Sequence, residues 1–163
     1  MIKFDQYYVA KFILQVLSLL CITTGSAQQD NVITYPQLGL SFEIPMGWSC
    51  QEIDNGYLMA SDVTPGFILV TTHDLFDMVS IQKEMSQKFE IGPNSILFPI
   101  GAFETINPTM VANTFTGTIS GNKAKAFICG ILNEYGLGLT IIGAANETLF
   151  SNGLREKALE VAQ

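Results

Sequence analysis

The chain of 163 residues is acidic, with 15 Asp and Glu residues against 8 Lys and Arg residues and a formal net charge of −7. Hydrophobic residues make up 48% of the sequence and charged residues 14%, which excludes an intrinsically disordered protein. Nucleic acids and anionic lipid headgroups are bound through clustered basic side chains. The chain has no Lys/Arg run, so both are disfavoured as partners.

Residues 1–27 have the pattern of an export signal. Two lysines and one aspartate lie at the start, an apolar run extends from Phe12 to Ile22, and small residues follow. This order is typical of a cleavable secretory signal peptide, and the apolar run is shorter than the roughly 20 residues of a spanning helix. We predict cleavage near Ala27 and a periplasmic or extracellular mature chain without a transmembrane segment. Residues 28–163 are expected to form a single domain, ordered from about residue 32.

The cysteine content depends on this cleavage. Cys21 lies within the signal, so the mature chain keeps Cys50 and Cys129 in a compartment where disulfides persist. Two interpretations stay open. The two residues form a disulfide if their Cα atoms come within about 7 Å of each other. Otherwise they are buried free thiols.

Four strands joined by tight turns are predicted between residues 40 and 72. The first alternates apolar and polar side chains, the period-2 pattern of a half-buried strand, and the turns contain Pro, Gly or an Asn-Gly pair. We expect the first two strands to form a hairpin and the others to follow through similar turns. The strands are Leu40–Ile44, Trp48–Glu52, Tyr57–Ala60 and Phe67–Thr72, and the turns are Pro45–Gly47, Asp54–Gly56 and Thr64–Gly66.

A helix is predicted to begin at Asp74 and to end before Gly92-Pro93. Asp74 is a suitable N-cap, and Asp77 places negative charge in the first turn, where the helix dipole favours it. Spacings of three and four residues predict a face that packs on the sheet, with Val79 widening it. That face comprises Leu75, Met78, Val79, Gln82, Met85 and Phe89.

The second half of the chain is predicted to form short strands within Ile96–Ile106, an antiparallel meander and a closing helix. The connections within the meander are too short for the crossovers that parallel strands need. The helix is expected to begin near Thr148 and to turn Leu154, Ala158 and Val161 or Ala162 inward. The fold class is therefore α+β, an antiparallel sheet packed with two helices. The strands of the meander are Met110–Ile119, Lys123–Leu132 and Leu137–Ala145.

The segment from Tyr35 to Trp48 resembles the opening strand and turn of the PsbP-like superfamily, and the order of the predicted elements extends the similarity over most of the mature chain. That superfamily includes photosynthetic lumenal proteins, a Ran-binding protein and bacterial periplasmic domains. Its members usually act as binding, assembly or chaperone-like accessories, so the resemblance implies a PsbP-like fold and a noncatalytic role. It transfers no active site, because the motif consists of turn and core residues.

His73, the only histidine, is the one weak candidate for a polar site, together with Asp74 and Asp77. One hypothesis is a metal site, or a general base oriented by Asp77. The other is a polar strand-to-helix junction whose aspartates serve the helix N-terminus. We favour the second, because a zinc site needs roughly three or four converging ligands. No catalytic, cofactor-binding or metal-binding residue is therefore predicted.

The sequence predicts an exported, noncatalytic accessory that binds another protein through an edge strand or a thinly charged face. The alternative is a binder of a small apolar ligand or, with less support, a hydrolase. An apolar groove would be lined by aromatic residues, although core packing is their more common role. The candidates for such a groove are Phe103, Phe115, Phe127 and Tyr135.

Overall fold

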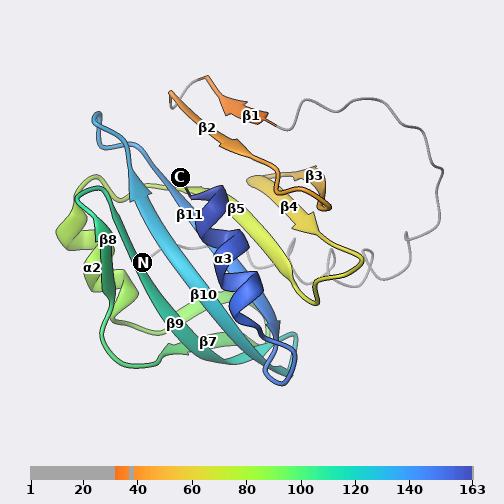
Figure 1. Ribbon diagram of the computed structural model, residues 1–163. Coiled ribbons are helices and arrows are strands. Elements are labelled where there is room, and N and C mark those ends of the chain that lie inside the picture. The colour runs from red at the N-terminus through yellow and green to blue at the C-terminus, as the bar shows by residue number, and fades with distance from the viewer. Residues whose placement is uncertain (1–31, 37–38, 163) are drawn as a thin grey trace.

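The computed structural model describes residues 32–36 and 39–162 (Figure 1). These residues form an α+β structure in which a curled antiparallel sheet is packed with two helices. The predicted export signal, Cys21 and the segment 28–31 lie outside the described residues.

Two sheets are present in the described part of the chain, and all their strand pairs are antiparallel. The small sheet pairs β1 (Val32–Tyr35) with β2 (Leu40–Glu43). The nine-stranded sheet has the order β3 (Ser49–Ile53), β4 (Gly56–Ala60), β5 (Phe67–His73), β11 (Gly138–Asn146), β10 (Asn122–Leu132), β9 (Met110–Ile119), β7 (Ser95–Pro99) and β6 (Phe89–Gly92), with β8 (Glu104–Asn107) also paired to β9. The helices are α2 (Met78–Met85) and α3 (Asn152–Val161).

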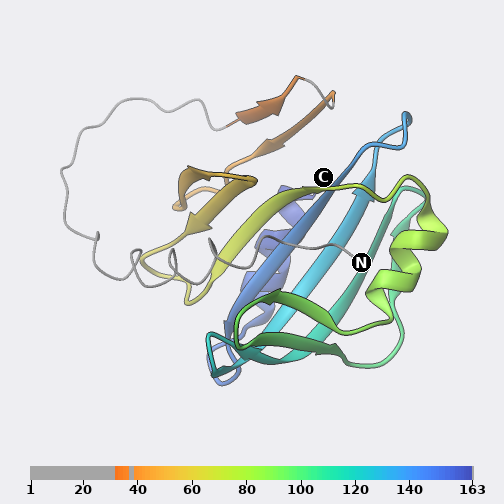
Figure 2. The same ribbon diagram turned by 180° about the vertical axis from the view of Figure 1, so that it is seen from behind.

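Both faces of the central strands β9, β10 and β11 are buried, each by different elements. Helix α3 and the β1–β2 sheet cover one face, and α2 covers the other face together with β6 and β7, as Figures 1 and 2 show from opposite sides. Alternation along β10 divides its side chains between the two cores, with Phe127 and Cys129 toward α3 and Ala126 and Ile128 toward α2. This two-sided burial explains the nearly continuous apolar runs of the meander.

Several predicted strand pairs are confirmed, and one is wrong. The β3–β4 and β4–β5 hairpins, the β9–β10–β11 meander and the short strands near residues 95–107 are present. The predicted hairpin between β2 and β3 does not form, because β2 pairs with β1 and β3 pairs with β4. The turn at Pro45–Gly47, where the Trp48 amide donates to the Pro45 carbonyl, instead carries the chain from one sheet to the other.

Both helices begin later than predicted, because different residues cap them. Asp77, and not Asp74, is the N-cap of α2, and Ser151 is the N-cap of α3. Helix α2 also ends at Met85, since the chain re-enters the sheet as β6, which contains Phe89. Val79 is 74% exposed, so its place in the predicted buried face is wrong. The inward residues predicted for α3 are confirmed; Leu154, Ala158, Val161 and Ala162 are all buried.

Candidate functional site

Both described cysteines are free thiols, Cys129 buried and Cys50 half-buried. Cys50 lies on the edge strand β3 and Cys129 on β10, with β4, β5 and β11 between them. Because neighbouring strands lie about 4.8 Å apart, this separation far exceeds the reach of a disulfide. Burial raises the pKa of Cys129 to about 12 and also raises the pKa of Cys50. Neither thiol is activated, since the thiolate is the reactive form.

His73 ends β5 and is 9% exposed, with both ring nitrogens engaged by the backbone. Its Nε2 lies 3.1 Å from the Ile131 carbonyl oxygen, and the Leu75 amide donates to its Nδ1 at 3.2 Å. This pattern assigns a neutral ring that donates from Nε2 and accepts at Nδ1. Burial lowers the pKa of His73, which also favours the neutral form. The imidazole therefore holds the end of β5 against β10 and orders the start of the next loop.

The two aspartates predicted beside His73 have different surroundings. Asp74 is exposed, and its charge acts on the imidazole. Asp77 accepts hydrogen bonds from the Ser80 side chain at 2.7 Å and the Ser80 amide at 2.9 Å, and these bonds lower its pKa. It therefore caps α2 and does not orient His73. Over residues 32–36 and 39–162, no group of three or more His, Cys, Asp or Glu side chains is arranged to hold a metal ion.

Protonation of His73 is expected to destabilise the fold at mildly acidic pH. Because burial lowers the pKa in the folded state, the unfolded chain binds the proton first, and stability falls as pH drops below about 6.5 toward the lowered folded value. One proton gives a slope of at most about 1.4 kcal/mol per pH unit. Urea unfolding between about pH 8 and pH 5 measures it. His73→Gln keeps an uncharged donor and acceptor, and equal slopes for the two proteins would contradict this prediction.

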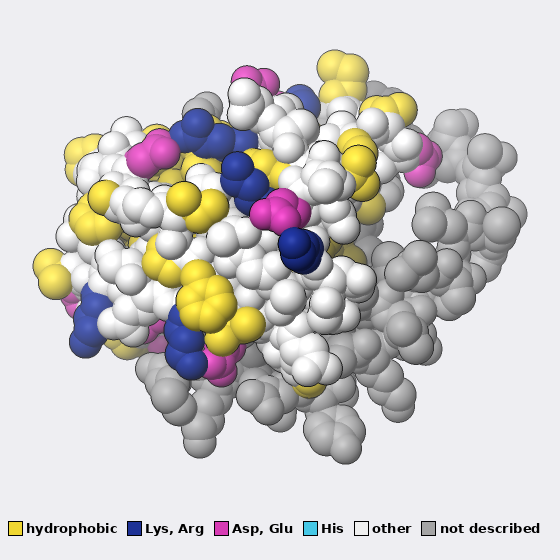
Figure 3. Space-filling view, turned by 90° about the horizontal axis from the view of Figure 1, so that it is seen from below, with side chains coloured by type: hydrophobic (Ala, Val, Ile, Leu, Met, Phe, Trp, Pro, Cys, Tyr) yellow, Lys and Arg dark blue, Asp and Glu magenta, His cyan; other side chains and the backbone are white. Residues whose placement is uncertain are grey.

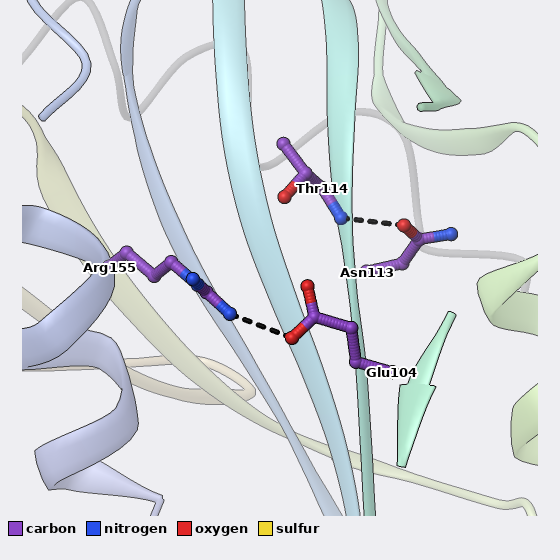
Figure 4. Close-up of polar contacts among 4 residues, drawn as sticks. All are labelled: Glu104, Asn113, Thr114 and Arg155. Carbon is purple, nitrogen blue, oxygen red and sulfur yellow. Dashed lines mark hydrogen bonds and ion pairs between the residues drawn. The ribbon is translucent and has the colours of Figure 1, made fainter. Parts of the chain in front are cut away.

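A long-range ion pair joins α3 to β8 across the sheet (Figure 4). The Arg155 Nη2 donates to Glu104 Oε2 at 2.7 Å, and the guanidinium carbon lies 4.8 Å from the centroid of the Phe127 ring. Asn113, on the adjacent strand β9, donates to the Met85 carbonyl at 2.8 Å and accepts from the Thr114 amide. The Arg155 Nε is buried without a hydrogen-bond partner, and the bonds that do form fasten both helices to the sheet.

The four aromatic residues predicted as a possible groove are not brought together. Phe115 and Phe127 are fully buried in the cores on opposite faces of the sheet. Phe103 is half-buried beside the α2 core, whereas Tyr135 is 75% exposed in the β10–β11 turn. Core packing accounts for the two fully buried rings, and the exposure of Tyr135 needs a different explanation.

A polar hollow of about 430 Å³ lies between the end of β1 and the β3–β4 turn. The rings of Tyr35, Phe42 and Tyr57 pack against one another here, with centroids 5.5 to 6.2 Å apart. Burial raises the pKa of Tyr35 to about 12, and its buried hydroxyl has no hydrogen-bond partner among the described residues. The lining is mainly polar, which does not suit a small apolar ligand. It consists of Thr34, Tyr35, Pro36, Glu52, Ile53, Asp54, Asn55, Gly56, Tyr57 and Thr72.

Three large apolar side chains project into solvent where the β5–α2 loop meets the β10–β11 turn. Phe76 is 69%, Val79 74% and Tyr135 75% exposed. The loop and the turn touch at Gly136, where an added Cβ would lie 3.1 Å from the Phe76 carbonyl oxygen. We call Phe76, Val79 and Tyr135 the aromatic end. The sequence patterns predict a buried Val79 and place Tyr135 in a possible groove. The one signal of exposure is the position of Tyr135 within a polar turn.

The backbone beneath the aromatic end is held by local hydrogen bonds. Asn133 Oδ1 accepts from the Tyr135 and Leu137 amides, both at 2.9 Å, and the Gly136 amide donates to the Asn133 carbonyl. On the other side, His73 holds Leu75 and Asp77 caps α2, as described above. The exposed side chains therefore project from hydrogen-bonded loops and, for Val79, from α2, an arrangement that lowers the entropy lost on binding.

The surface elsewhere is thinly charged. Figure 3 shows one face on which small groups of apolar side chains and scattered basic and acidic side chains lie among backbone and other side-chain atoms. In the described ranges, no helix has the length and apolar character that a membrane crossing requires.

A scan against protein-family models finds none that matches the chain. A search of curated proteins finds no match either.

Proposed function

We propose that this chain is an exported, noncatalytic accessory protein that binds another protein through the aromatic end. The observation that carries the proposal is the exposure of Phe76 and Tyr135 on hydrogen-bonded loops and of Val79 in the first turn of α2. Aromatic and large apolar side chains dominate the binding energy of protein interfaces. Leaving three of them in solvent at one place is a cost that a partner would remove by covering them.

Export and family membership belong to the same proposal. The order of charged, apolar and small residues in 1–27 supports export with cleavage near Ala27, to the periplasm or the extracellular space. The α+β architecture, with two helices on an antiparallel sheet, agrees in broad outline with the PsbP-like resemblance of residues 35–48. That resemblance supports an accessory role.

Site-specific photo-crosslinking in the native host tests the proposal. The full chain, with a photoreactive phenylalanine analogue at Tyr135, is expected to yield a discrete crosslinked product in the exported fraction. The same analogue at Leu149, which is 54% exposed in the β11–α3 loop, is the matched control and is expected to yield none. The mass of the recovered chain should correspond to a start near Gln28. Equal crosslinking at both positions would contradict the binding surface, and a cytoplasmic chain beginning at Met1 would contradict export.

Removing the three side chains of the aromatic end measures how much they contribute to partner binding. Phe76→Ser, Val79→Ser and Tyr135→Ser together are expected to weaken partner binding by at least about 100-fold, because anchor residues each contribute about 1 kcal/mol or more. The control combines Met46→Ser, Val63→Ser and Leu149→Ser, which remove apolar groups that are 88%, 86% and 54% exposed at other positions. It should bind as the unaltered protein does.

A further inference from the structure

Resting on the proposed function, we infer that the aromatic end binds a basic segment of its partner, one in which Lys or Arg side chains flank an aromatic or aliphatic anchor. The charges around the aromatic end support this partner chemistry. Asp74 and Asp77 flank Phe76 within two positions, and Glu134 directly precedes Tyr135. Three acidic residues therefore lie within two positions of Phe76 or Tyr135, against one basic residue near Val79, Lys83, which follows one turn later on α2.

These three carboxylates are exposed and, like several others in the described chain, take part in none of its ion pairs. Glu90, Glu104 and Glu160 each form an ion pair with a Lys or Arg, at 2.6 to 2.7 Å. Among the described residues, no ion pair involves Asp74, Asp77 or Glu134, and all three are exposed. Asp77 already accepts from Ser80 as the cap of α2, so Asp74 and Glu134 are the carboxylates available to pair with a partner's cations.

The aromatic rings and the carboxylates at this surface favour the same ligand chemistry. Phe76 and Tyr135 offer aromatic faces that attract a guanidinium or ammonium group and also accept an apolar anchor. The surrounding carboxylates form charge-assisted hydrogen bonds with the same cations. An acidic segment would meet the like charges of Asp74, Asp77 and Glu134, and burying carboxylates against carboxylates is unfavourable. Acidic segments are therefore rejected by the same residues.

Three fluorescent peptides of equal length are the probes for this inference. The first combines Lys and Arg with Leu and Trp, the second replaces its basic residues by Glu, and the third replaces its apolar residues by Ser. Fluorescence anisotropy with the protein purified from its host is expected to show about tenfold or tighter binding of the first peptide relative to each of the others. Raising the salt from about 50 to about 300 mM should weaken that binding several-fold, because exposed charges are screened.

Charge variants locate the effect on the protein. Asp74→Asn with Glu134→Gln is expected to weaken binding of the basic apolar peptide about fivefold, because an exposed charge pair contributes about 0.5 kcal/mol or roughly twofold. Asp77 is left unchanged, because it caps α2. Glu43→Gln with Glu156→Gln removes two charges that are also exposed but lie elsewhere, and it should leave the affinity unchanged.

The outcomes separate this inference from the proposed function. Equal binding of the basic and acidic peptides, or equal losses from the two pairs of charge variants, would overturn the basic-segment inference. Unchanged peptide binding by the variant that lacks all three apolar side chains of the aromatic end would overturn it as well. A specific crosslink at Tyr135 would still support the proposed function in each of these cases. Absence of that crosslink, with peptide binding retained, would count against the accessory role alone.

Discussion

Replacing Phe127 by Ala is expected to lower the free energy of unfolding by about 4 kcal/mol, the largest effect among the substitutions considered. The ring is fully buried between β10 and α3, so its removal loses transfer free energy and leaves a cavity. The Arg155 guanidinium also loses the aromatic face on which it lies. Urea denaturation monitored by far-UV circular dichroism measures the change.

The control for Phe127 is Phe98, which lies on β7 and is 49% exposed. Phe98→Ala removes the same group and is expected to cost less than about 1 kcal/mol. If the Phe127→Ala protein does not fold, Phe127→Leu provides a milder substitution, with an expected loss of about 1.5 kcal/mol. Comparable losses for Phe98→Ala and Phe127→Ala would show that Phe127 does not occupy the core position described.

Replacing Gly138 by Ala is expected to destabilise the protein by about 3 kcal/mol. Gly138 pairs with His73 across β11 and β5, and a Cβ at this position would lie 2.2 Å from His73 Cε1 and 2.3 Å from the Ile131 carbonyl oxygen. One of these neighbours is backbone, so the clash is relieved only by moving a strand or displacing the imidazole. Displacement would also break the hydrogen bond between His73 and Ile131.

Gly153→Ala is the matched control for Gly138→Ala. Gly153 lies in the first turn of α3, where an added Cβ would be 3.7 Å from Ser151 Oγ, an ordinary contact. The helix propensity of Ala should therefore stabilise this variant by up to about 1 kcal/mol. The two substitutions should shift the thermal midpoint in opposite directions. A Gly138→Ala protein as stable as the unaltered chain would rule out the close packing of His73 against β11.

Much of the strand arrangement was predictable because its causes are local. The Asp54-Asn55-Gly56 turn and the short connections of the meander encode their hairpins within a few residues, and the structure contains them. The pairing of β2 was predicted wrongly, because β1 and β3 both lie next to β2 in sequence and β1 is the strand that pairs with it. The predicted helix was too long because the spacing of Phe89 fits a helical face as well as it fits a strand.

The candidate site was far less predictable than the strands. The positions of His73 and Asp77 beside the helix start indicated a junction residue and a residue that serves the helix N-terminus. The capping role itself was assigned to Asp74. The separation of Cys50 from Cys129 depends on the order of five strands, which neither residue's sequence context reveals. The Arg155–Glu104 ion pair joins residues 51 positions apart and has no local signature.

The sequence by itself determined the α+β class, the antiparallel meander and the inward face of α3, since turn chemistry and periodicity act over a few residues. Only the tertiary structure decided which apolar side chains stay in solvent. The loops that carry Phe76 and Tyr135 come together because β5 pairs with β11, although these loops are about 60 residues apart in the chain. Hydrophobicity alone does not distinguish such residues from core residues, because exposure depends on which strands become neighbours.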